Sequence, residues 1–186
     1  MNSNFIIKLK DNLTSLRINL NGKKLSKKYI IIESDDWGAI RTPSKEVLNK
    51  YIKNNVVLDD SIYKYDSLET EKDLERLFDV LNSVKDINGN PAIFTTNTIL
   101  ANPDFEKIKA SNFDKYYYEP FIETYAKYPN TNNNIKLLKQ GISEKLILPQ
   151  FHGREHINVN RWLKDLRNGS KGTMLSFSLN STFSCF

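Results

Sequence analysis

The sequence predicts an α/β protein built on a parallel sheet. Short apolar runs with strand character, at 27–34, 91–97 and 145–151, alternate with longer stretches of helical character. Such an order implies βαβ units, so the strands run parallel and the sheet is either open or closed into a barrel. In both arrangements the chemistry collects at the carboxyl ends of the strands. The polar residues that follow 27–34 and 145–151 are therefore the first candidates for a functional site.

The first predicted strand is the segment KKYIIIES, Lys27 to Ser34, whose three isoleucines are typical of a strand buried on both faces. A helix is expected after the turn at WGAIRTP. Pro43 can occupy its first position with Thr42 as the cap, and SKEVLNKYIKNN continues it. Together these segments predict the first βα unit.

A second helix is predicted between residues 68 and 90, because apolar residues recur there with helical spacing and Gly89 stands where a helix would end. The recurring apolar residues are Leu74, Leu77, Phe78, Leu81 and Val84. After the strand PAIFTTN, Pro91 to Asn97, a short helix is expected with Asn102 as its cap and Pro103 at its first position.

The rest of the chain continues the alternation. NNNIKLLKQGIS predicts a helix, KLILPQF a strand, NVNRWLKDLRNGS a helix, and GTMLSFSL (172–179) a further strand. Trp162 is expected on the apolar face of its helix together with Leu163 and Leu166. Tyrosines cluster between residues 116 and 128, where packing against the sheet is the commoner use and a sugar-stacking platform is the alternative.

Composition limits the classes of partner. The net charge of +5 has one local concentration, NGKKLSKKY, and it lacks interleaved aromatics, so it is interpreted as a solvated surface and no nucleic-acid partner is expected. The single cysteine, Cys185, excludes an intrachain disulfide and fits a reducing compartment. The sequence has neither a signal-peptide core nor a run long enough for a membrane span, so a soluble, cytoplasmic protein is expected. Residues 1–26 are expected to form an N-terminal extension and residues 27–186 one α/β domain.

Two carboxylates, Asp35 and Asp36, end the first predicted strand in the sequence SDDWG. Adjacent carboxylates repel each other, so a purely structural role needs a separate partner for each. Because neighbouring side chains of an extended chain point to different sides, one carboxylate could bind a cation while the other faces a substrate. A turn or helix-cap pair is the alternative interpretation.

The two histidines of the chain, His152 and His156, follow the strand KLILPQF in the sequence HGREH. Imidazoles at i and i+4 face the same side of a helical turn and can chelate one metal ion. A tetrahedral ion then needs one more protein ligand and an open position for water, and an Asp from the end of the first strand supplies that ligand. Two histidines and one carboxylate suit Zn²⁺, with Co²⁺, Ni²⁺ and Fe²⁺ as alternatives.

The same residues also match the inverted zincin pattern H-x-x-E-H, in which Glu155 would be the general base of a peptidase. That pattern requires both histidines within one helix and a distant acidic ligand. Pro149 and Gly153 argue against a continuous helix, and little chain follows His156. A peptidase is therefore the weaker hypothesis.

The segments IIIESDDWG and PQFHGREH resemble those of the polysaccharide deacetylase family, the NodB-homology domain of family 4 carbohydrate esterases. The likeness is to a divergent bacterial branch of that family, and it extends from about Tyr29 to Asn168. It implies a metal-dependent (β/α) barrel that removes acetyl groups from an N- or O-acetylated saccharide. HGREH departs from the family's His-Ser/Thr-x-x-His at Gly153, which has no hydroxyl to offer.

Carried over to this chain, the resemblance implies that Asp35 is the catalytic base and that Asp36, His152 and His156 hold the metal. Four further residues are candidates for contacts around the metal ligands or the substrate: Trp37, Asn97, Arg154 and Glu155.

The family also uses a later arginine that orients the base and a later histidine that acts as general acid, and neither is evident in this sequence. Its barrel has more strands than this chain supplies, so the deacetylase-like domain at 27–186 is expected to be incomplete or irregular at its C-terminal end. A catalytically incomplete protein that binds a saccharide or a partner protein is the alternative.

Overall fold

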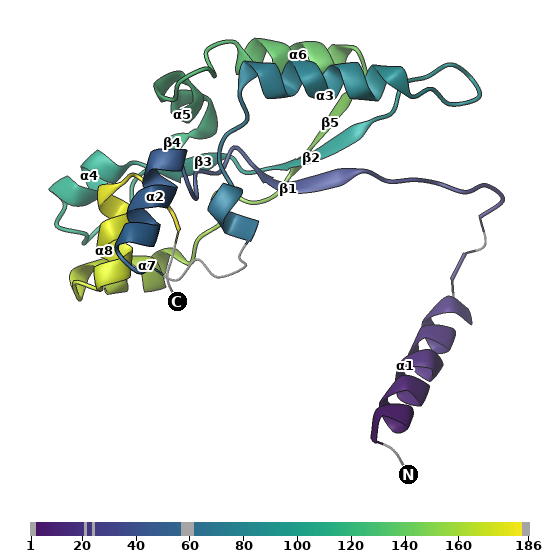
Figure 1. The fold of residues 1–186 in the computed structure, drawn as a ribbon, viewed down its shortest axis with the longest axis horizontal. Coiled ribbons are helices and arrows are strands. Elements are labelled where there is room, and N and C mark those ends of the chain that lie inside the picture. The colour runs from purple at the N-terminus through teal and green to yellow at the C-terminus, as the bar shows by residue number, and fades with distance from the viewer. Residues whose placement is uncertain (1–2, 21, 24, 57–61, 184–186) are drawn as a thin grey trace. The chain divides into compact units, whose positions relative to one another are not determined.

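The computed structural model of the protein describes residues 3–20, 22–23, 25–56 and 62–183 (Figure 1). The chain divides into two compact units, residues 1–30 and residues 31–186. Among the described helices, none combines the length and the apolar character needed to cross a bilayer.

The first unit contains one helix, α1 (Ser3–Leu20), whose side chains from Ile6 onward are exposed. The lysines at 23, 27 and 28 are also exposed, as the interpretation of a solvated surface requires. Lys24 of the segment NGKKLSKKY and Cys185 lie outside the described residues.

The second unit is built on two small sheets. A parallel sheet has the strand order β1-β2-β5, and a short antiparallel pair joins β3 to β4. The strands are β1 (Glu33–Trp37), β2 (Phe94–Thr98), β3 (Ala101–Pro103), β4 (Tyr118–Pro120) and β5 (Ile147–Phe151). The predicted α/β class with a parallel sheet is confirmed, and among the described residues this sheet is open rather than closed into a barrel.

Seven α-helices and one 3₁₀ turn complete the described part of this unit. They are α2 (Lys45–Lys53), the 3₁₀ turn (Ile62–Tyr65), α3 (Glu71–Ser83), α4 (Phe105–Ala110), α5 (Phe121–Lys127), α6 (Asn134–Ser143), α7 (Val159–Arg167) and α8 (Lys171–Ser178). The helices predicted around 68–90, around NNNIKLLKQGIS and around NVNRWLKDLRNGS are confirmed. Thr70 and Asp73 form a capping box at the start of α3, which fixes where that helix begins.

The first strand begins later than predicted. β1 starts at Glu33, and Ile30 and Ile31 are 90% and 78% exposed, so the prediction of a strand over 27–34 buried on both faces is wrong. The reason is the length of the neighbouring strand. β2 starts at Phe94, and its Thr95 amide donates to the carbonyl of Ile32 at 2.9 Å, so the residues before Ile32 have no partner strand in the described structure.

Two predicted helix starts are also wrong. Ser44, not Thr42, caps α2, because the Ser44 hydroxyl accepts from the Val47 amide. Asp104, not Asn102, caps α4, since Asn102 belongs to β3 and is buried. Asn102 instead donates from Nδ2 to the carbonyl of Gly38 at 2.7 Å, and this bond holds the turn that follows β1.

Two further predictions are wrong, one for the segment 172–179 and one for the end of α3. The segment 172–179, predicted as a strand, forms α8, whose buried residues Thr173, Ser176 and Phe177 recur at helical spacing. This buried face packs against the core around Trp162, and that packing favours the helix over the predicted strand. α3 ends at Ser83, and Gly89 lies beyond it in the turn that leads to β2.

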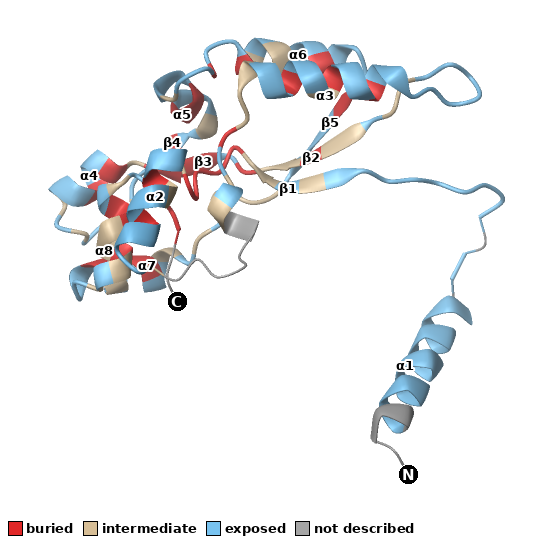
Figure 2. Ribbon diagram, viewed as in Figure 1, coloured by how far each residue is buried: buried red, intermediate tan, exposed pale blue. Residues whose placement is uncertain are grey.

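Two hydrophobic clusters position the site. One surrounds Trp162 among α4, α7 and α8, and it confirms the expected apolar face with Leu163 and Leu166. The other lies between the sheet and the helices α3 and α6, which cover one sheet face (Figures 1 and 2). α3 and α6 approach closely at Gly141, where an added Cβ would lie 2.7 Å from the Phe78 ring. The sheet is therefore anchored from one side, while Glu33 and Leu148 on its other side are exposed.

Candidate metal centre

Asp36 lies at a distortion in β1. The pairing with β2 shifts register between Ser34 and Trp37, and Asp36 has a φ of 63°. Asp tolerates this left-handed conformation better than most residues. The turn is closed by the amide of Ala39, which donates to the Asp36 carbonyl at 3.0 Å. This backbone leaves the Asp36 side chain only 14% exposed.

The two histidines come from the loop after β5. The His152 amide donates to the carbonyl of Thr98 at 2.9 Å, which places the loop at the carboxyl end of β2. Gly153 has a φ of 102° and the loop is not helical, so the expectation that one helical turn aligns the imidazoles is wrong. The loop itself brings the rings together, with 5.3 Å between their centroids and 8° between their planes.

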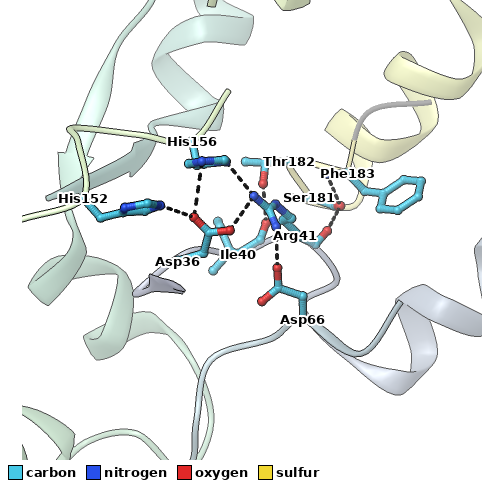
Figure 3. Close-up of polar contacts among 9 residues, drawn as sticks. All are labelled: Asp36, Ile40, Arg41, Asp66, His152, His156, Ser181, Thr182 and Phe183. Carbon is cyan, nitrogen blue, oxygen red and sulfur yellow. Dashed lines mark hydrogen bonds and ion pairs between the residues drawn. The ribbon is translucent and has the colours of Figure 1, made fainter. Parts of the chain in front are cut away.

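Asp36, His152 and His156 form one cluster whose ligand atoms all lie within 4.8 Å of one another (Figure 3). Asp36 Oδ1 is 3.3 Å from His152 Nε2 and 3.6 Å from His156 Nε2. Ligands held at about 2.0–2.2 Å around a tetrahedral ion are separated by roughly 3.3–3.6 Å. The two carboxylate-to-imidazole distances therefore match a shared metal ion. Protonated imidazoles would make ion pairs at the same contacts.

The environment of Asp36 Oδ1 also suits a metal. This oxygen is buried and has no hydrogen-bond partner among the described residues. A buried carboxylate oxygen without a donor is costly, and a cation removes that cost. The donor set of two imidazoles and one carboxylate fits a divalent transition metal.

Arg41 and Asp66 complete the cluster and were not among the residues singled out from the sequence. Arg41 Nη2 lies 2.8 Å from Asp36 Oδ2 and 2.7 Å from His156 Nδ1, while Nη1 donates to Asp66 Oδ2 at 2.9 Å. Burial raises the pKa of the Asp66 carboxyl, and the charge of Arg41 opposes that rise. The position of Arg41 just after an acidic strand end was the available signal, whereas nothing in YKYDSLE marks Asp66.

Asp35 faces a different environment from Asp36. Its side chain is exposed, and Asn97 on β2 donates from Nδ2 to Asp35 Oδ1 at 2.5 Å. Asp35 and Asp36 nevertheless line the same pocket of about 200 Å³, together with Asp66 and Glu69. The structure thus places the Asp36 carboxylate beside the two imidazoles, and the Asp35 carboxylate in an exposed position on a pocket that both residues line.

Arg154 and Glu155 pair with each other, away from the cluster. Arg154 Nη2 donates to Glu155 Oε1 at 2.8 Å, and the guanidinium lies 4.9 Å from the centroid of the Tyr118 ring. Glu155 offers no ligand atom to the group formed by Asp36 and the histidines. The arrangement expected of an inverted zincin, with this glutamate beside the metal, is therefore not present among these residues.

Trp37 and the predicted tyrosine cluster serve mainly in packing. The Trp37 ring meets Phe94 edge-on at 5.7 Å, in the cluster beneath α3 and α6. Tyr125 is buried in the core around Trp162. Tyr118 is 51% exposed, and the Arg154 guanidinium lies over its ring.

Comparison of the chain with protein-family models, curated proteins and solved structures gave no match.

Proposed function

We propose that the protein is a metal-dependent hydrolase that removes acetyl groups from an N- or O-acetylated saccharide. Asp36, His152 and His156 would hold the ion, most suitably Zn²⁺, with Co²⁺, Ni²⁺ or Fe²⁺ as alternatives. The observation that carries the proposal is the buried Oδ1 of Asp36, which has no hydrogen-bond donor and faces both imidazoles at ligand spacing.

When bound, a divalent ion at this site lowers the pKa of water and polarises an acyl carbonyl. Asp35 then takes the proton of the attacking water, because it is exposed and lines the pocket that Asp36 also lines. Asn97 holds one oxygen of Asp35 and so fixes the direction in which the carboxylate faces. The proposed base and the proposed carboxylate ligand thus come from adjacent residues, Asp35 and Asp36, with separate environments.

The fold is consistent with this chemistry. We propose that β1, β2 and β5 correspond to part of a (β/α) barrel of the deacetylase type. The site lies at the carboxyl ends of these strands, where barrel enzymes carry their chemistry. The exposed sheet face with Glu33, Asp35 and Leu148 is the one that a closed barrel would turn inward.

Acetate release from a panel of N- and O-acetylated oligosaccharides tests the proposal. Purified protein supplied with Zn²⁺ or Co²⁺ is expected to release acetate, and a His152→Ala variant is expected to release none. Metal binding without acetate release from any member of the panel would remove the assignment as a deacetylase. Equal release by the His152→Ala variant would remove the assigned metal centre.

A catalytically incomplete protein that binds an acetylated saccharide is the second candidate. It is favoured by one fact, which is that both histidines of the chain belong to the metal cluster and none remains as general acid. This candidate predicts saccharide binding by calorimetry with no acetate release.

A further inference from the structure

Arg41 occupies the centre of a network that reaches both the carboxylate and one imidazole of the metal cluster (Figure 3). Its Nη2 contacts Asp36 Oδ2 and His156 Nδ1 at 2.8 and 2.7 Å, and its Nη1 donates to Asp66 at 2.9 Å. The Arg41 side chain is 10% exposed, so these contacts are largely shielded from water. A cation is thus already present beside the proposed metal ligands.

The contact with His156 has a consequence for metal binding. A guanidinium has only N–H donors, so His156 Nδ1 must accept from Arg41. In a neutral imidazole the single proton then sits on Nε2, the atom that faces Asp36. A metal bound at Nε2 requires the opposite arrangement, with the proton on Nδ1 and an acceptor opposite it. Arg41 offers no acceptor.

The backbone of Arg41 is held in place, so its side chain is the part that can change. The Ser181 hydroxyl donates to the Arg41 carbonyl. The Thr182 amide and hydroxyl both donate to the Ile40 carbonyl, at 3.0 and 2.9 Å. Asp66 provides the guanidinium with a second anchor that does not involve a metal ligand.

We propose that Arg41 is a stand-in cation, and that its contact with His156 and a metal ion at His156 Nε2 exclude each other. Without metal, Arg41 compensates the buried Asp36 and keeps His156 in the form that cannot ligate. When metal binds, the guanidinium leaves His156 Nδ1 and remains paired with Asp66. This inference rests on the metal centre proposed above. It implies that Arg41 lowers the affinity of that centre for metal.

The test compares metal affinity in three proteins. An Arg41→Gln variant removes the positive charge and the N–H donor that faces His156 Nδ1, so its Zn²⁺ affinity is expected to rise by roughly 10- to 100-fold, the scale of changes next to metal ligands. Arg17→Gln in α1 is the matched control and is expected to bind as the wild type does. Competition titration against a chromophoric chelator gives the three dissociation constants.

The imidazole proton provides a readout that a purely structural role would not move. Long-range ¹H–¹⁵N spectra are expected to place the His156 proton on Nε2 in the metal-free wild type and on Nδ1 after Zn²⁺ is added. In the metal-free Arg41→Gln variant, Nδ1 no longer has to accept from a guanidinium, so the proton is expected to be shared between Nε2 and Nδ1.

The outcomes separate this inference from the proposed function. Weaker Zn²⁺ binding by Arg41→Gln than by the wild type would overturn the role of Arg41 and leave the metal centre standing, provided that the variant's circular dichroism is native. A proton on Nδ1 in the metal-free wild type would overturn it as well. Failure of every protein to bind Zn²⁺, Co²⁺, Ni²⁺ or Fe²⁺ would overturn the metal centre itself, and the inference with it.

Discussion

Asp35 and Asp36 are identical neighbours in the sequence and occupy opposite environments in the fold. Asp36 has a left-handed backbone, is largely buried, and contacts Arg41 and two imidazoles. Asp35 keeps the strand conformation on the open side of the sheet, where one amide contacts it. The register shift in β1 separates them. The difference teaches that a break in strand geometry, rather than residue type, gives two neighbouring carboxylates two different environments.

The largest effect is expected for metal affinity when Asp36 is substituted. Asp36→Asn keeps the size of the side chain and the tolerance for positive φ, but it removes the charge that a cation needs. Metal affinity should fall by more than about 100-fold, because a direct ligand matters more than the residues around it. Equilibrium dialysis with metal analysis measures this, and full metal content in the variant would remove the assignment of Asp36 as a ligand.

The next effect concerns Asp35 alone. Asp35→Asn should retain wild-type metal content and lose acetate release by about 10²- to 10⁴-fold, the range of a general base. Metal content and acetate release, measured on the same preparation of the variant, distinguish a catalytic base from a metal ligand. Loss of metal from Asp35→Asn would contradict the hypothesis that Asp35 acts as a base without contributing to metal binding.

A smaller effect is expected from the amide that holds Asp35. Asn97→Ala removes the 2.5 Å hydrogen bond to Oδ1 without touching the metal cluster. Loss of orientation should lower kcat by roughly 10-fold, within the range known for misplaced catalytic groups. Steady-state kinetics with an acetylated oligosaccharide shows whether KM stays near its wild-type value, as expected for a residue that orients the base.

The smallest effect is expected at Glu155. This carboxylate pairs with Arg154, whose side chain is half exposed, and it lies outside the Asp36–His152–His156 cluster, so Glu155→Gln should change acetate release by less than about 3-fold. The inverted zincin hypothesis expects the reverse, with hydrolysis of peptides abolished by Glu155→Gln and unaffected by Asp35→Asn. A peptidase assay on both variants therefore decides between the two carboxylate roles.

Patterns in neighbouring residues predicted those helices and strands that are determined by neighbouring residues. The helical period of Leu74, Phe78 and Leu81 predicted α3, and all three residues are buried. The joining of Asp36 to the two histidines followed from the rule that parallel strands end at one edge. The α/β class followed in the same way from the alternation of elements.

Features that depend on distant partners were not predictable in this way. Ile30 and Ile31 have strand character but no partner strand among the described residues. GTMLSFSL forms a helix because its buried face packs against the core around Trp162. Arg41 was missed because its partners His156 and Asp66 are brought to it by the fold. Hydrophobic period carries no information on such contacts.

Hydrogen bonds from Ser181 and Thr182 hold the loop after β1, and they bear on the order in which the site forms during synthesis. The Thr182 hydroxyl and the Ile40 carbonyl are 142 positions apart, and Arg41 and His156 are 115 positions apart. A chain leaving the ribosome therefore exposes its two aspartates long before their partners exist. Closing such long loops is slow. The side chains of the Asp36–His152–His156 cluster are all present once residue 156 has been made, whereas the bonds that hold the backbone of residues 40 and 41 also need residues 181 and 182.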